Sequence, residues 1–150
     1  MRSIVREIEI PTSIDQTFEL LCRPSAIRQW WGAARAIVHR EQGGLWIAAW
    51  GENEDEPDYV SAARLLVYEP PHRMVMGDFE YHAREEGPLP FEAEMVTEYV
   101  IEPNSGGGSR LRVRQWGFPD DPSADDFYAG CETEWDRTLE NLQRFASSLD

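Results

Sequence analysis

Tryptophan and tyrosine side chains are the residues of this sequence that point most directly to a binding site. The chain has six tryptophans in 150 residues, and two of them, Trp30 and Trp31, are adjacent. Each tryptophan ring buries a large apolar area and needs a partner for its N–H. An apolar pocket with a few polar groups is the usual make-up of a small-molecule site. We therefore expect one aromatic set to line a pocket for a hydrophobic or aromatic ligand: Trp31, Trp46, Trp50, Tyr99, Tyr128 and Trp135.

Three further side chains are assigned to the same predicted pocket. Met76 adds apolar surface, and the carboxylates of Asp78 and Glu134 add polar contacts at its edge. The orientation of Asp78 depends on strand parity, because a single bulge beside it would bring Phe79 and Tyr81 to the inner face instead. For each member of the pocket, the alternative is that the side chain only fills the core.

No catalytic motif accompanies these residues. The sequence lacks the HExxH, CxxC and phosphate-binding glycine patterns, and the absence of lysine excludes a Schiff-base mechanism. The histidines, none of which lies in a nucleophile motif, are His39, His72 and His82. One predicted strand carries three carboxylates, Glu92, Glu94 and Glu98. A carboxylate that faces inward with a raised pKa would be a candidate for acid/base chemistry. A carboxylate that faces water would not.

Neither a metal nor a cofactor is predicted. The acidic runs at 52–58 and 120–126 lack the alternating ligands and the terminal bidentate glutamate of an EF-hand, so solvated loops explain them better. The two cysteines, Cys22 and Cys131, lack the spacing of metal ligands and lie among apolar neighbours. We interpret them as reduced thiols in the core of a cytosolic protein.

Length and charge restrict the class of protein. A chain of 150 residues is expected to form one domain, covering residues 1–150. With 28 acidic against 14 basic residues, the net charge is −14, which disfavours nucleic acid and anionic membrane surfaces as partners. No signal peptide or apolar run of about 18 residues is found, so we expect a soluble, cytoplasmic protein.

The elements that must position the aromatic residues follow from hydrophobic periodicity. Alternation predicts a strand over 3–10, and Ser13 with Gln16 forms a capping box that begins a helix. A second short helix begins at Pro24 and ends at Trp30-Trp31-Gly32. Short strands and turns follow, predicted over 34–41, 45–50, 59–68, 73–81, 91–102 and 109–116.

A long amphipathic helix is predicted at the end of the chain, over residues 124–148. Apolar residues recur there at steps of three and four, among them Cys131, Trp135, Leu139 and Leu142. The complete order is β-α-α-β-β-β-β-β-β-α, which indicates an α+β fold with an antiparallel sheet of six or seven strands. One helix of this length covers only part of a curved sheet, and the two short helices close one end, so a cavity is expected between the layers.

This order, with several short motifs, resembles a known family. The motifs are Arg6-Glu7-Ile8-Glu9-Ile10-Pro11, Pro24 with Trp30-Trp31, Gly43-Gly44-Leu45-Trp46, Glu69-Pro70-Pro71 before Arg73-Met74, Gly107-Gly108-Ser109-Arg110-Leu111, Gly117-Phe118-Pro119, and Trp135 with Leu139 and Leu142. Together they resemble the START-like or SRPBCC superfamily, and within it the homologues of the C-terminal domain of the activator of heat-shock-protein-90 ATPase. The resemblance implies a helix-grip fold, in which the sheet wraps around the long C-terminal helix.

The chain departs from the family pattern at three places. Glu134 stands where the family usually has glycine before the helix tryptophan, and Asp78 lies near the usual position of another tryptophan. Leu45 and Ile47 occupy a strand face that the family often fills with polar residues. That apolar face is a candidate surface for a homodimer.

The resemblance leaves three functions open. The first, which the aromatic residues and the missing catalytic motif favour, is a single-domain, bacterial-type protein that encloses a hydrophobic small molecule. The second is an enzyme of the polyketide cyclase or aromatase kind. The third is a chaperone-binding module, which is least favoured because the chain has only the one domain, and fold transfers more safely than activity.

Overall fold

The computed structural model describes residues 1–85 and 89–149. In chain order, strands and helices follow the predicted sequence of elements. Their bounds are β1 Arg2–Ile10, α1 Ile14–Cys22, α2 Pro24–Trp30, β2 Arg35–Val38, β3 Leu45–Trp50, β4 Tyr59–Glu69, β5 Arg73–Ala83, β6 Val96–Pro103, β7 Ser109–Phe118, the 3₁₀ turn η1 Pro122–Ala124, and α3 Asp125–Ser147. The predicted α+β helix-grip fold is confirmed.

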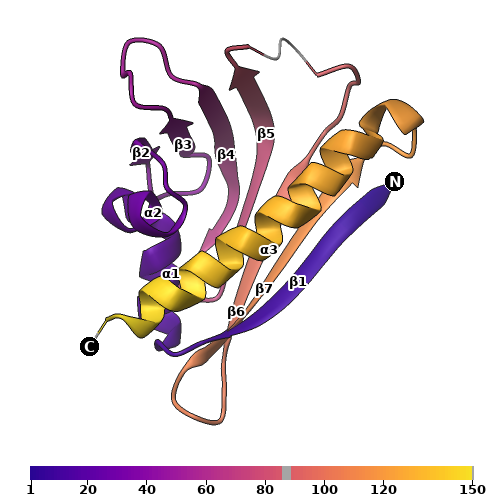
Figure 1. Cartoon of the computed structure of the whole chain (residues 1–150). Helices are drawn as coiled ribbons and strands as arrows, with labels where there is room; N and C mark the ends of the chain where they lie inside the picture. The colour runs from indigo at the N-terminus through magenta and orange to yellow at the C-terminus, as the bar shows by residue number, and fades with distance from the viewer. Residues whose placement is uncertain (86–88, 150) are drawn as a thin grey trace.

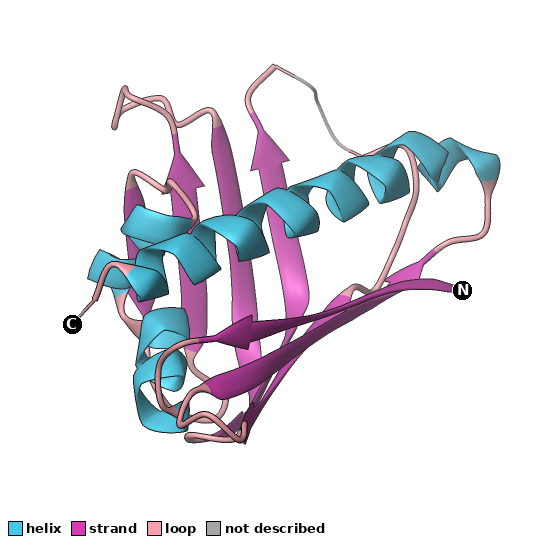
Figure 2. Ribbon diagram, turned by 60° about the horizontal axis from the view of Figure 1, so that its bottom comes forward, coloured by secondary structure: helices cyan, strands magenta, loops and turns pink. Residues whose placement is uncertain are grey.

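The strands form one antiparallel sheet of seven strands in the order β1-β7-β6-β5-β4-β3-β2. The sheet curves around helix α3, which crosses its concave side (Figure 1). Pairing between β5 and β6 covers only Arg73 to Met76 against Thr97 to Val100. Beyond Met76, β5 pairs with β4 alone, and the two halves of the sheet diverge toward the end where α3 begins (Figure 2).

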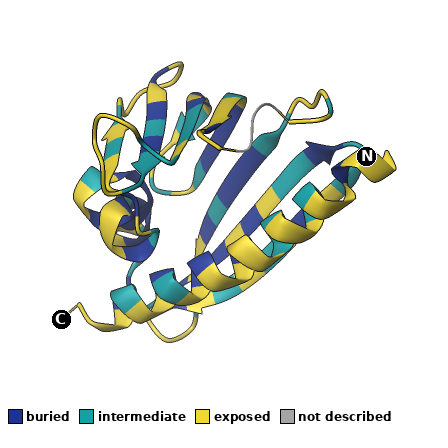
Figure 3. Cartoon of the chain, turned by 45° about the horizontal axis from the view of Figure 1, so that its top comes forward, coloured by how far each residue is buried: buried dark blue, intermediate teal, exposed yellow. Residues whose placement is uncertain are grey.

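Helix α3 has 23 residues, which corresponds to about 35 Å of length. Its buried side chains, Trp135, Thr138, Leu139, Leu142 and Ala146, follow helical spacing and face the sheet, while the opposite side is exposed (Figure 3). Polar contacts fix the helix along the edge strand β1: the Arg6 guanidinium lies 2.6 Å from Asp136 and 3.5 Å from Glu132.

The two short helices close the other end of the concave side. The predicted capping box is present, because the Ser13 hydroxyl accepts a hydrogen bond from the Gln16 backbone and the Gln16 side chain accepts one from the Ser13 backbone. Proline at its first turn begins α2. The Trp30 Nε1 donates to the Leu20 carbonyl over 2.8 Å, which ties α2 to α1.

Several predicted boundaries differ from the structure. The strand predicted over 91–102 begins only at Val96, because β5 and the chain before β6 diverge. The strand predicted over 34–41 is reduced to Arg35–Val38. The strand predicted over 73–81 continues to Ala83, and residues 86–88 of the loop that follows lie outside the described residues.

A bulge in β5 settles the strand parity that the sequence left open. Arg64 pairs with Gly77 and Ala62 pairs with Glu80, so β5 carries extra residues opposite β4. Asp78 occupies the bulge with φ of 52°, a conformation that L-residues rarely adopt. As a result, Phe79 packs against the core and Asp78 is exposed.

Candidate functional site

The candidate site is a cluster of aromatic rings around Trp31, on the concave side of the sheet beneath α3. The Trp31 ring follows the last residue of α2 and stacks on Trp30 with centroids 5.1 Å apart. It also contacts Trp46 and Trp50 of β3 at 5.5 and 6.0 Å, and Trp135 of α3 at 5.7 Å. Trp31 is half-buried and therefore lies at the edge of the cluster that it joins together. We call these five rings the Trp31 cluster.

The indole N–H groups of the cluster differ in their partners. Trp50 donates to the Trp31 carbonyl over 3.1 Å, and Trp135 donates to Oε1 of Gln115 over 2.8 Å. Among described residues, the N–H groups of Trp31 and Trp46 have no hydrogen-bond acceptor. Neither nitrogen is among the enclosed unpaired side-chain atoms of the described residues, so both donors remain accessible to water or to another partner.

Tyr99 continues the cluster across the sheet. Its ring meets Trp135 edge-on, with centroids 6.1 Å apart, and only 2% of the residue is exposed. Burial raises the pKa of the Tyr99 hydroxyl above its ordinary value, so the group stays protonated. No described residue forms a hydrogen bond with this hydroxyl.

The structure brings most of the predicted aromatic pocket together. Trp31, Trp46, Trp50, Tyr99 and Trp135 are in mutual ring contact, directly or through Trp31 and Trp135. Met76 is buried in the same core on the inner face of β5. That these side chains bind a ligand remains a prediction.

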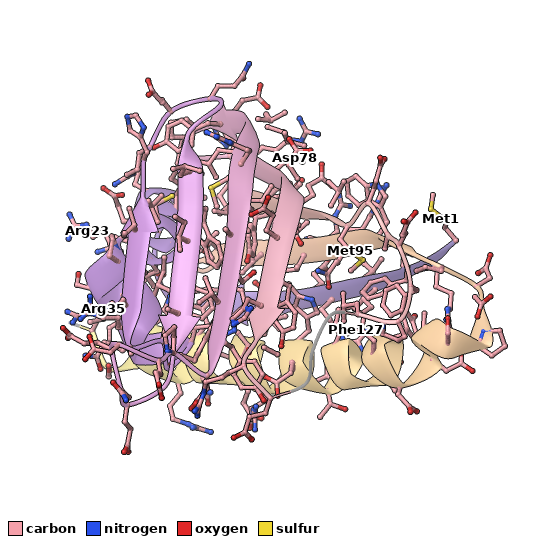
Figure 4. The ribbon with its side chains drawn as sticks, turned by 90° about the horizontal axis from the view of Figure 1, so that it is seen from above. Met1, Arg23, Arg35, Asp78, Met95 and Phe127 are labelled. Atoms are coloured by element: carbon pink, nitrogen blue, oxygen red, sulfur yellow. The ribbon has the colours of Figure 1, made fainter. Side chains whose placement is uncertain are left out.

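Three predicted site residues lie elsewhere. Asp78 is exposed and lies on the side of the sheet away from α3 (Figure 4), because the bulge turns it outward. Glu134 is exposed on the outer side of α3, where it pairs with Arg137. Tyr128 is near the start of α3, and its hydroxyl donates to the Ser3 carbonyl over 2.8 Å.

The carboxylates considered for acid/base chemistry do not face the cluster. Glu92 and Glu94 are exposed. Glu98 is buried, but it lies on the face of β6 opposite Tyr99 and pairs with Arg73 over 2.8 Å. These positions fit the solvated or structural alternative for all three side chains.

The concavity itself is filled by the aromatic rings. Two hollows among the described residues lie on the surface. The larger hollow, about 150 Å³, lies beside Trp50 at the ends of β2 and β3. A smaller one, about 20 Å³, lies on the outer face between Val100 and Arg110. Neither of these hollows lies beneath α3.

Three residues of the site were not predicted. Trp30 was recognised only as the neighbour of Trp31, although its ring is 1% exposed and stacks on Trp31. Gln115 accepts the Trp135 N–H, and alternation along β7 could have indicated that it faces inward. Thr97, 1% exposed, pairs directly with Gln115 across β6 and β7.

Further groups among the described residues were considered for a second site. Cys22 and Cys131 are free thiols, and the described residues contain no cluster of three metal-ligating side chains. None of the described helices is both long enough and apolar enough to cross a membrane. On the outer face, Leu45 is 37% exposed and Ile47 pairs with Ile37, which is 60% exposed. Self-association through this face stays a prediction.

Comparison with known proteins gives a family and a fold. The family model described as Activator of Hsp90 ATPase homolog 1-like protein matches residues 11–147. No curated protein matches the sequence. Several crystal structures share the fold over almost the whole chain. Protein MLL2253 from Mesorhizobium loti has a TM-score of 0.77 at 21% identity, and 99% of each chain is covered.

Two further structures come with lower identity. CalU16 from Micromonospora echinospora has a TM-score of 0.67 at 17% identity, covering 98% of this chain and 77% of CalU16. DynU16, a protein of the dynemicin biosynthetic locus, has a TM-score of 0.73 at 14% identity, covering 97% of this chain and 47% of DynU16. At these identities the likeness shows the fold alone.

Proposed function

We propose that this chain, which belongs to the family of Activator of Hsp90 ATPase homolog 1-like proteins, encloses a hydrophobic or aromatic small molecule between its sheet and α3. The observation that carries the proposal is the position of Trp31. Its half-buried ring lies among four other tryptophan rings, and its N–H has no acceptor among the described residues. A flat ligand ring would find the same neighbours there.

Of the five rings in the cluster, the Trp31 ring is the one that a ligand could displace most easily. Its backbone is fixed, because its N–H donates to Ile27 and its carbonyl accepts from Trp50. Its ring is held by ring contacts alone, each worth about 0.5–1.5 kcal/mol beyond buried area. A ligand ring that replaces it restores similar contacts, so the exchange costs little and opens the concavity from the side of α2.

The relatives in fold are compatible with this role. DynU16 is a protein of a biosynthetic locus, which fits a fold that handles small molecules. In this chain, the inward side chains of the cluster carry no charge, so they offer an apolar enclosure with isolated polar groups. That composition is typical of small-molecule sites.

The test combines native mass spectrometry with fluorescence. Freshly purified protein should carry a small molecule that leaves on denaturation, and aromatic compounds that bind should quench tryptophan emission. Trp31→Phe should reduce the quenching and raise the affinity, because the smaller ring is displaced more easily by a ligand. The matched control is Trp116→Phe, because Trp116 lies on the outer face beneath the Arg114 guanidinium, 4.3 Å from its ring centroid.

The two variants distinguish binding in the Trp31 cluster from nonspecific binding of aromatic compounds to the protein. An affinity that rises in Trp31→Phe and is unchanged in Trp116→Phe supports a site in the Trp31 cluster. Equal effects in both variants, or no bound compound from a library of aromatic and lipid molecules, would refute it.

A further inference from the structure

We infer that the ligand is an uncharged aromatic molecule with hydrogen-bond acceptors, such as carbonyl or ether oxygens, and that Tyr99, Thr97 and Gln115 donate to them. The inference rests on the proposed function and specifies its ligand. It follows from the unpaired polar groups that line the inner face of the sheet beneath Trp135.

The first step is the set of buried hydroxyls. Tyr99, Thr97 and Thr138 are 1–3% exposed, and none forms a hydrogen bond with a described residue. Thr138 lies one turn after Trp135 on the buried side of α3. Leaving such a group unpaired costs about 1–3 kcal/mol, so buried hydroxyls normally have a partner.

These hydroxyls are not sealed in the core. Among the described residues, the side-chain oxygen that is fully enclosed and has no hydrogen bond is Oε2 of Glu19. The hydroxyls of Tyr99, Thr97 and Thr138 are therefore not fully enclosed. Each of the three hydroxyls must therefore border a small space that a water molecule can reach. Because Tyr99 meets Trp135 edge-on, that space adjoins the Trp31 cluster.

The second step is the orientation of the Gln115 amide. Trp135 Nε1 can only donate, so the oxygen of Gln115 must face it, at 2.8 Å. The NH₂ group then points away from Trp135, and no described residue accepts from it. Thr97 is the direct cross-strand neighbour of Gln115, so donors from β6 and β7 lie side by side.

The third step is the balance of donors and charges. The N–H groups of Trp31 and Trp46 and the NH₂ of Gln115 donate only, and the hydroxyl of Tyr99 stays protonated because burial raises its pKa. A ligand must therefore supply acceptors. No unpaired cation accompanies these donors, since the inward Arg6 of β1 is held by carboxylates of α3. An anionic ligand would lack a partner for its charge.

The experiment compares two flat probes that differ by one oxygen. 9-Fluorenone carries a carbonyl acceptor, and fluorene has the same rings without it. Binding of each is measured by tryptophan quenching and by calorimetry, with the wild-type chain, Tyr99→Phe, Thr97→Val and the control Tyr68→Phe. Tyr68 has a hydroxyl outside the cluster, where it accepts from Arg40 over 3.0 Å.

We expect the wild-type chain to bind fluorenone more tightly than fluorene, and Tyr99→Phe or Thr97→Val to weaken fluorenone by about two- to tenfold while leaving fluorene unchanged. Tyr68→Phe should alter neither. Equal binding of the two probes would overturn the inference and leave the proposed function standing. A preference for fluorenone that persists in both variants would overturn the assignment of the donors. Binding of neither probe would contradict both proposals.

Discussion

Replacing Trp31 by alanine should leave a hole that free indole can fill. Complete burial of a tryptophan makes its replacement by alanine cost about 3–5 kcal/mol. Trp31 is half-buried, but it loses contacts with four tryptophan rings, so we expect a loss of about 2–3 kcal/mol. For a chain of this size, that lowers the melting temperature by about 5–10 °C.

The decisive measurement is rescue by indole. If the Trp31 ring holds the place of a ligand, indole should bind in the hole of Trp31→Ala and stabilise the folded state. At about ten times its dissociation constant, a ligand that binds only the folded state contributes about 1.4 kcal/mol. Urea denaturation with and without indole should therefore recover about half of the loss.

The control is Trp116→Ala, which removes a tryptophan of the outer face beneath Arg114. Its loss should be smaller, and indole should not restore it. If indole stabilises both variants equally, it binds elsewhere. If it stabilises neither, the space around Trp31 closes when the ring is removed, and the idea that this ring holds a ligand's place is wrong.

Three further predictions concern single groups. Tyr99→Phe should change the free energy of unfolding by less than about 1 kcal/mol, because the hydroxyl bonds no described residue and borders a space that water can reach; a clearly lower midpoint in urea would show that the hydroxyl has a protein partner. A hydrogen bond from Asn104 lowers the pKa of Glu9, so the stability that this carboxylate contributes is present above the ordinary carboxyl pKa and is lost as the pH falls through the lowered value; the difference between the wild-type chain and Glu9→Gln should vanish once the pH is below that lowered pKa. Burial raises the pKa of Cys22 and Cys131 to about 12, so both thiols should resist Ellman's reagent near neutral pH until the chain is unfolded, and fast reaction of the folded protein would contradict this burial.

The fold was predictable because each element has a local cause. The capping box at Ser13 begins α1, the proline at the start of α2 fixes its first turn, and the alternation of β3 places Trp46 opposite Leu45. Helical spacing likewise places Trp135, Leu139 and Leu142 on one side of α3. Patterns of this kind depend on near neighbours in the sequence, so no knowledge of tertiary contacts is needed.

Asp78 and Glu134 show where local reasoning fails. The bulge at Asp78 depends on the pairing of β5 with β4, which only the assembled sheet determines. Glu134 lies one residue before Trp135 and four before Thr138, which are both buried, yet it is exposed and pairs with Arg137. Helical spacing alone therefore did not decide its position.

The donors beneath Trp135 could not have been predicted, because a missing partner is a property of the whole fold. Thr97 and Gln115 read as ordinary strand residues in the sequence. Only the antiparallel register brings them side by side, and only the indole of α3 decides which end of the Gln115 amide is free.

The aromatic rings and the unpaired donors together support the proposal that this core also binds a ligand. A core selected for stability alone would pair its hydroxyls or replace them by apolar groups, as Thr97→Val and Tyr99→Phe would do at almost constant shape. The chain instead keeps these polar groups 1–2% exposed, and Tyr99 contacts Trp135, which in turn contacts the Trp31 ring. Unpaired donors lower stability in the free protein, and a ligand acceptor would restore it. Under this proposal, the residues whose donors are unpaired in the free protein would thus determine which ligand binds.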